Sequence, residues 1–285
     1  MREASRCARV SRVLTSDHHV RFTVLDAGPL WDGVRRGHPQ LEADACTRLV
    51  ELLSAALLLQ SRTFFSERLQ LVLKGTGRIK ALVADSWPEG DIRGILDLSE
   101  GDSGLPWIQG PGSLRVMRSN PKGQPYLGTL ELVHGDIQAQ VEAYLLQSEQ
   151  VQASTTLWCD PGTGEAGGLL VEPLPGCPRE RLARVVQAIE GLEVVPNWER
   201  EPEFLCRWVN QGEGAEILST TEVQYRCRCR KESLLEVLQG FVRSRLDELF
   251  PEDGPVEVRC DYCGTSYLIR RSDLRLAEDR GHAGA

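Results

Sequence analysis

The sequence predicts an α+β protein made of an N-terminal domain of antiparallel sheet and helices, a helical linker and a small C-terminal zinc-binding module. Three observations predict this architecture. Apolar residues recur at helical spacing over residues 41–60, whereas the short apolar runs that follow are separated by Gly and Pro clusters, which is typical of antiparallel strands. Residues 173–178 are dense in Pro and Gly, which end any regular element. Beyond them, four of the nine cysteines lie in two close pairs.

The N-terminal domain is expected to span residues 1–177. Its main helix covers residues 41–60, where the many leucines and alanines predict that the helix is largely buried. A second helix is expected at residues 136–147. Strands are expected in a hairpin at residues 69–74 and 79–84, then at residues 90–98, 113–118 and 126–133, and in a pair on either side of the turn at residues 160–164.

The linker is expected to span residues 178–226. Residues 179–194 place apolar side chains at helical spacing. Residues 198–222 instead scatter single apolar residues among Glu, Arg and Gly, so this segment needs another surface to stay folded. The residues alone leave two interpretations open: an ordinary linker packed on the main domain, or a segment that is only marginally stable.

The composition narrows the class of protein. The chain of 285 residues has a formal net charge of −8, which argues against a dedicated nucleic-acid binder because attraction to phosphate requires a basic face. There is no run of about 18 apolar residues, and the polar N-terminus lacks the apolar segment of a secretory signal. We therefore expect a cytoplasmic protein that does not interact with membranes.

Residues 227–285 form the third part and carry the strongest chemical signal in the chain. Cys227 and Cys229 form a C-x-C pair, and thirty residues later Cys260 and Cys263 form a C-x-x-C pair. Zinc prefers four tetrahedral ligands, and thiolates suit it well. The spacing therefore predicts one zinc ion bound by these four cysteines.

The elements expected around the cysteines agree with a zinc module. Residues 256–259 and 265–269 lead into and out of the second pair, which predicts a hairpin with Gly264 in its turn. A helix is expected at residues 232–250. Because such a module has a small apolar core, we expect the metal to supply much of its folding free energy.

Basic residues surround the first cysteine pair and favour the thiolate form of its thiols: Arg226, Arg228, Arg230 and Lys231. This environment fits a closed structural zinc site, and it also fits a site that reacts with oxidants. The other cysteines are interpreted as small buried hydrophobic residues: Cys7, Cys46, Cys159, Cys177 and Cys206. No motif in the chain demands catalysis.

Together these residues resemble the heat shock protein 33 family of redox-regulated chaperones. The C-x-C and C-x-x-C pairs have the family's spacing, and Tyr267 follows the second pair as it does in the family. The resemblance covers most of the chain beyond about residue 40. It also rests on segments of the main domain: Tyr144 with Ser148-Glu149-Gln150, Gly167-Gly168, Leu174-Pro175-Gly176, Lys74-Gly75-Thr76-Gly77 and Asp91-Ile92-Arg93-Gly94.

The resemblance implies a holdase chaperone of the stress response and not an enzyme. The reduced protein would hold one zinc ion and be inactive. Oxidation would form the disulfides Cys227–Cys229 and Cys260–Cys263 and release the metal. The module and the linker would then unfold, exposing apolar surface that binds unfolded client proteins without ATP, and the oxidised form would be a homodimer.

Two other functions are weighed against this one. A constitutive zinc-ribbon adaptor that binds nucleic acid or protein would use the basic residues around Cys227, although the acidic chain argues against it. A thiol–disulfide oxidoreductase would use Cys260 and Cys263. Such enzymes usually place their C-x-x-C pair at a helix N-terminus, whereas a strand is expected before this one.

Overall fold

The structure is a computed structural model that divides into two compact units, Met1–Arg226 and Cys227–Ala285. It describes residues 7–63, 65–101, 104–120, 123–191, 202–210, 214–239, 248–250 and 254–274.

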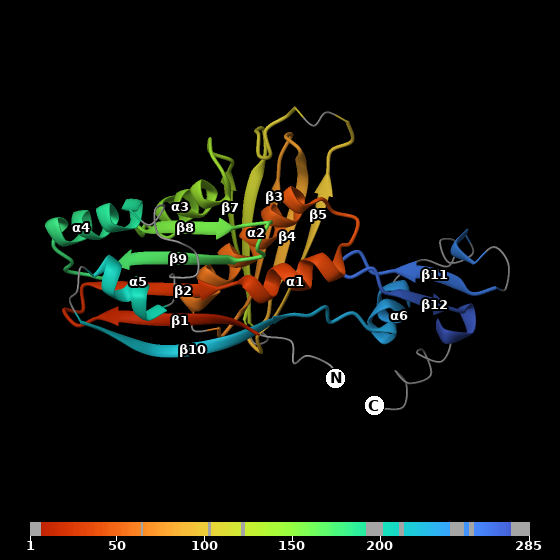
Figure 1. Cartoon of the computed structure of the whole chain (residues 1–285). Coiled ribbons are helices and arrows are strands. Elements are labelled where there is room, and N and C mark those ends of the chain that lie inside the picture. The colour runs from red at the N-terminus through yellow and green to blue at the C-terminus, as the bar shows by residue number, and fades with distance from the viewer. Residues whose placement is uncertain are drawn as a thin grey trace. The chain divides into compact units, whose positions relative to one another are not determined.

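The first unit is built on one sheet of ten strands in the order β7-β6-β3-β4-β5-β10-β1-β2-β9-β8. Neighbouring strands are antiparallel except β5 and β10, which are parallel over two residue pairs. In Figure 1 the strands on the two sides of this junction run in clearly different directions. The strands are β1 (Ala8–Thr15), β2 (Val20–Asp26), β3 (Arg68–Lys74), β4 (Ile79–Ser86), β5 (Asp91–Leu98), β6 (Ser113–Ser119), β7 (Tyr126–Glu131), β8 (Ser154–Cys159), β9 (Ala166–Pro173) and β10 (Ala215–Tyr225).

Three helices cover one face of the sheet: α1 (Gly28–Gly37), α2 (Ala43–Ser61) and α3 (Ile137–Ser148). Helix α2 is apolar on nearly all sides and is buried along most of its length, as its composition predicts. It packs on alternate residues of the strands, such as Val10 of β1, Leu25 of β2 and Leu170 of β9. The α+β class and the expected positions of α2, α3 and strands β3 to β9 are confirmed.

The opposite face of the sheet is covered by two helices of the expected linker, α4 (Arg179–Glu190) and α5 (Pro202–Val209). Their apolar side chains pack on the residues that alternate with those beneath α2, including Phe22 of β2 and Leu169 of β9. The predicted helix at residues 179–194 is found as α4, which ends at Glu190 with Gly191 as its C-cap, and residues 192–194 lie outside the described residues.

The expectation of a helical linker is wrong for residues 215–225, which form strand β10. This strand pairs with β1 from Ala8 opposite Val223 to Thr15 opposite Ala215. Its Ile, Thr and Val residues favour an extended backbone, but its partner lies some two hundred residues away in sequence. Strands β1 and β2 and helix α1, for which the sequence supported no specific prediction, complete this part of the fold.

A network of ion pairs holds together the ends of α2 and α3 and the neighbouring strands. Arg62, which follows α2, contacts Glu172 of β9 at 2.6 Å and also contacts Glu149 at the end of α3. Arg21 of β2 lies 2.8 Å from Glu172, and Arg118 of β6 contacts Glu149. Glu172 is only 2% exposed, so its charge depends on these two arginines.

We expect the substitution Glu172→Ala to lower the free energy of unfolding of the main unit by about 3 kcal/mol, because it removes the buried carboxylate that pairs with Arg21 and Arg62. Urea unfolding followed by circular dichroism measures this change. Glu131→Ala, at an exposed position of β7, is the control and should change stability by less than about 0.5 kcal/mol. Equal effects of the two substitutions would contradict the role of the network.

Candidate metal centre

A hairpin positions the second cysteine pair. Strands β11 (Val256–Arg259) and β12 (Ser266–Ile269) pair antiparallel, with Arg259 opposite Ser266. In the turn between them, the Cys260 N–H donates to the Thr265 carbonyl at 2.9 Å, and the Gly264 N–H donates to the Cys260 carbonyl at 2.8 Å. Gly264 has a φ of +68°, which a residue with a side chain rarely adopts. The predicted hairpin is confirmed.

The first cysteine pair immediately precedes helix α6 (Lys231–Gln239), so Cys227 and Cys229 lie on the irregular segment that leads into it. The helix predicted at residues 232–250 is described over α6 and again at residues 248–249, and the part at residues 240–247 lies outside the described residues. Among the described side chains of this unit, the buried apolar core consists of Leu238, Phe250, Ile269 and Leu274.

The structure brings the four predicted cysteine ligands together. Their sulfur atoms all lie within 4.8 Å of one another. Cys227 Sγ is 3.7 Å from Cys260 Sγ, and Cys229 Sγ is 3.4 Å from Cys263 Sγ. Four sulfurs at the usual zinc–sulfur distance of about 2.3 Å from a tetrahedral ion would lie about 3.8 Å apart. The sulfur positions therefore fit a zinc ion.

The sequence did not predict that two hydroxyl groups lie next to the sulfurs. The Tyr267 hydroxyl lies 3.1 Å from Cys229 Sγ and donates to the Cys229 carbonyl at 3.1 Å. The Thr265 hydroxyl lies 3.2 Å from Cys263 Sγ. Tyr267 entered the sequence argument only through the family resemblance, although hydroxyl residues two and four positions after a C-x-x-C pair in a hairpin are well placed to reach the sulfurs of the cluster.

The surroundings of the thiols change their pKa values in opposite directions. Burial raises the pKa of Cys229, and it raises that of Cys260 to about 12. Burial also opposes ionisation of Cys263, but hydrogen bonds from the hydroxyl and backbone N–H of Thr265 outweigh it and lower the pKa of Cys263 to about 7. Cys263 therefore ionises more readily than the other two, and a cation is needed to favour the thiolate form of Cys229 and Cys260.

Two of the four basic residues around the first pair are held by carboxylates. Arg226 pairs with Asp91 at 2.7 Å, and Lys231 pairs with Asp273 at 2.7 Å. Burial, the largest influence on Cys229, raises the pKa of this thiol. The effect of the basic residues on the reactivity of the first pair stays a prediction.

The remaining cysteines lie apart from the four-cysteine cluster among the residues that the structure describes. Cys46 is buried, as predicted, and burial raises the pKa of Cys159 to about 12. Cys7, Cys159 and Cys177 are all partly exposed, so the interpretation of all five as buried side chains is wrong for these three. The side chain of Cys206 lies outside the described part of the chain.

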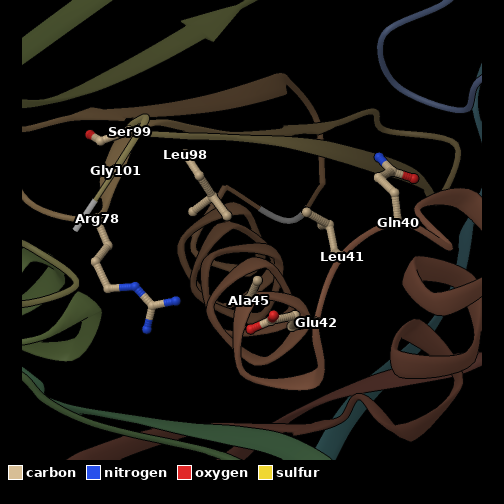
Figure 2. A pocket seen from close by; sticks show the side chains of 8 residues that line it. All are labelled: Gln40, Leu41, Glu42, Ala45, Arg78, Leu98, Ser99 and Gly101. Atoms are coloured by element: carbon tan, nitrogen blue, oxygen red, sulfur yellow. The ribbon is translucent and has the colours of Figure 1, made fainter. Parts of the chain in front are cut away.

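A cavity of about 250 Å³ lies at the start of α2 (Figure 2). Leu41 and Leu98 contribute apolar surface to it, and Glu42 and Arg78 contribute opposite charges. The residues that line it include no cysteine or histidine, so it has no ligand set like that of the metal centre.

Within the described residues, no helix combines the length and the apolar character that crossing a bilayer requires.

Comparison with known proteins places the chain among chaperones. The family model described as "Hsp33 protein" matches residues 8–270. A 33 kDa chaperonin of Thermus thermophilus is 29% identical over 94% of this chain and 85% of its own length, and one of Lactobacillus delbrueckii subsp. bulgaricus is 26% identical over 94% and 97%. The crystal structure of a 33 kDa chaperonin from Thermotoga maritima, a heat shock protein 33 homologue, has a TM-score of 0.78 at 23% identity and covers 97% of this chain and 99% of that one.

We expect the reduced protein to bind one zinc ion per chain, and Cys260→Ser to weaken this binding at least about tenfold because a hydroxyl is a much poorer zinc ligand than a thiolate. Metal analysis after dialysis, together with competition against a chromogenic chelator, measures both quantities. Cys177→Ser is the matched control, since this thiol lies outside the cluster. Full zinc affinity in the Cys260 variant would show that the four sulfurs do not form the site.

Proposed function

We propose that this chain, which belongs to the Hsp33 family, is a redox-regulated, ATP-independent holdase chaperone of the cytoplasm. The observation that carries the proposal is the convergence of four thiols within 4.8 Å in a unit whose described residues form only a small apolar core. Such a unit folds around a metal and cannot stay folded once its thiolates are lost. The name "33 kDa chaperonin" of the relatives supports a chaperone.

The proposed switch is the oxidation of both cysteine pairs by a peroxide. In each pair, two thiols lose two protons and two electrons as the S–S bond forms, and one hydrogen peroxide accepts them to give two water molecules. Four thiols therefore consume two peroxide molecules. Zinc, when bound, supplies the ligand bonds that hold the two pairs together. Disulfide sulfurs no longer serve as thiolate ligands, so oxidation releases the metal.

We propose the disulfides Cys227–Cys229 and Cys260–Cys263 from the family resemblance. The shortest sulfur distances instead join the two pairs, at 3.4 Å between Cys229 and Cys263 and 3.7 Å between Cys227 and Cys260. Geometry therefore does not select the pairing, and peptide mapping of the oxidised protein decides it.

The apolar surface proposed for client binding lies under the linker helices. Helices α4 and α5 cover a sheet face that includes Phe22, Val24 and Leu169, and they contribute apolar side chains such as Val185 and Leu205. If these helices leave the sheet, this face becomes available to the apolar segments of unfolded proteins. An exposed apolar face of this kind also supports the proposed homodimer of the oxidised form.

Polar contacts fix the linker helices in place. Arg181 of α4 is only 3% exposed; its Nε donates to Asp17 in the β1–β2 turn at 2.9 Å, and it also donates to the Asn210 side chain at the end of α5. The Asn210 amide donates to the Gly214 carbonyl just before β10 at 2.8 Å. These contacts join α4, α5 and the start of β10, so the parts of the linker are expected to leave the sheet together.

The C-x-x-C position does not favour an oxidoreductase. Cys260 and Cys263 lie in a turn between two strands and not in the first turn of a helix, where such enzymes usually place this pair. We therefore propose that the protein binds its clients and does not catalyse disulfide exchange.

We expect hydrogen peroxide to release one zinc ion per chain, consume four thiols of the cluster and suppress the aggregation of a heat-denatured client protein. A chromogenic chelator, a thiol assay and light scattering measure these on one sample. The variant Cys177→Ser should behave as the wild type does. Zinc that stays bound, or zinc release without suppression of aggregation, would contradict the redox-regulated function.

The buried arginine gives a second test that needs no oxidant. Arg181→Ala removes the side chain that joins α4 to the turn and to α5, so the reduced variant should bind an apolar-surface dye more strongly and gain partial holding activity. Arg184→Ala, at an exposed position of the same helix, is the control and should remain inactive. An Arg181 variant with no gain in dye binding would show that α4 and α5 do not cover the client-binding surface in the way proposed.

A further inference from the structure

The last residue of β10 is held in the main unit by contacts that no step of the proposed switch uses. The Tyr225 hydroxyl lies 2.9 Å from His38 Nε2 and donates to the Gly94 carbonyl at 3.3 Å. His38 Nε2 is itself 3.0 Å from that carbonyl. His38 is only 3% exposed, and it follows the end of α1 directly. The ring nitrogen of His38, the Gly94 carbonyl of β5 and the Tyr225 hydroxyl of β10 thus lie within hydrogen-bonding distance of one another.

The ring of Tyr225 lies on a glycine surface of α1. Gly33 and Gly37 are four residues apart, so they share one face of this helix. A Cβ atom added at Gly33 would lie 2.4 Å from the Cβ of Tyr225 and 2.7 Å from its Cγ, and one added at Gly37 would lie 3.2 Å from the ring. Even alanine is too large at Gly33 while Tyr225 occupies its position, so the close contact requires glycine there.

Backbone hydrogen bonds surround the same point. The Gln224 N–H donates to the Gly90 carbonyl at 2.8 Å, and the Arg226 N–H donates to the Ile92 carbonyl at 2.9 Å. The Arg226 guanidinium contacts Asp91 at 2.7 Å. These bonds form the junction between β10 and β5, the only strand pair that joins the two halves of the described sheet.

Most side chains in the N-terminal part of β10 are exposed. Ile217 is 40% exposed and Leu218 is 49% exposed. Val223 and Tyr225, near the C-terminal end of the strand, supply the well-packed side-chain contacts of β10. Strands usually fray from their ends, and the C-terminal end of β10 lies directly before Cys227.

We propose that Tyr225, seated on Gly33 and Gly37 and bonded to His38, is a latch that keeps β10 in the sheet when residues 227–285 unfold. This proposal rests on the proposed function, in which the zinc module unfolds and the linker leaves the sheet. The latch makes these two separate events. Its residues all belong to the main unit, so removal of metal leaves them in place. Release of β10 then requires a second event, the displacement of Tyr225 from its seat.

Hydrogen exchange in the full-length, reduced protein tests the latch without oxidant or client. The metal is removed with a chelator, and the exchange of residues 223–226 is compared with that of residues 227–239. In the wild type, residues 223–226 should stay protected while residues 227–239 lose protection. In Gly33→Ala they should exchange at least about tenfold faster, because the added methyl group displaces the Tyr225 ring.

Whether Gly33→Ala speeds or slows hydrogen exchange at residues 223–226 distinguishes the latch from a local effect on the helix. In a helix, replacement of glycine by alanine normally stabilises the structure, so a merely local effect would slow exchange. Asp32→Ala, at an exposed position of α1, is the matched control and should exchange like the wild type. Tyr225→Phe removes only the hydroxyl and is the second variant should Gly33→Ala fail to fold; we expect about fivefold faster exchange.

Two results would overturn the latch. One is loss of protection at residues 223–226 together with residues 227–239 in the metal-free wild type. The other is wild-type protection in both Gly33→Ala and Tyr225→Phe. Neither depends on whether peroxide raises holding activity, so failure of the latch is distinguishable from failure of the proposed function.

Discussion

The structure of residues 227–285 depends on holding four sulfur atoms in mutual contact. Burial favours the neutral form of Cys229 and Cys260, and the apolar core among the described residues of the unit is small. A tetrahedral zinc ion would stabilise the thiolates and tie the C-x-C segment to the hairpin. In the proposed switch, an oxidant attacks these same thiolates, so the interaction proposed to fold this unit is also the one that oxidation removes.

The main unit depends on β10 for a different reason. This strand pairs with β1 over most of its length and with β5 at its last residues, so it connects the two halves of the described sheet. Much of its side-chain surface is exposed, and its stability therefore comes from backbone pairing and from the packing of its C-terminal end. A connection of this kind is strong only while that end is held.

The sequence predicted the parts of this protein that short-range patterns specify. Apolar periodicity located α2 and α3, alternation and turn residues located β3 to β9, and cysteine spacing predicted which four thiols come together. It did not predict β10, because the partner of that strand is β1 at the other end of the main unit. The seat of Tyr225 was also missed, since a glycine pair in a helix acquires meaning only from the side chain that packs on it.

The buried charge of Arg181 suits the proposed release of helices α4 and α5 from the sheet. A buried, paired arginine contributes little net stability compared with apolar residues of similar size, but it requires specific partners. Arg181 therefore fixes the position of α4 and α5 through Asp17 and Asn210 without holding them as tightly as a larger apolar interface would. Once one partner is lost, the remaining buried charge destabilises the cover. In the proposed switch, a linker built in this way is well positioned when folded and would be released as one piece.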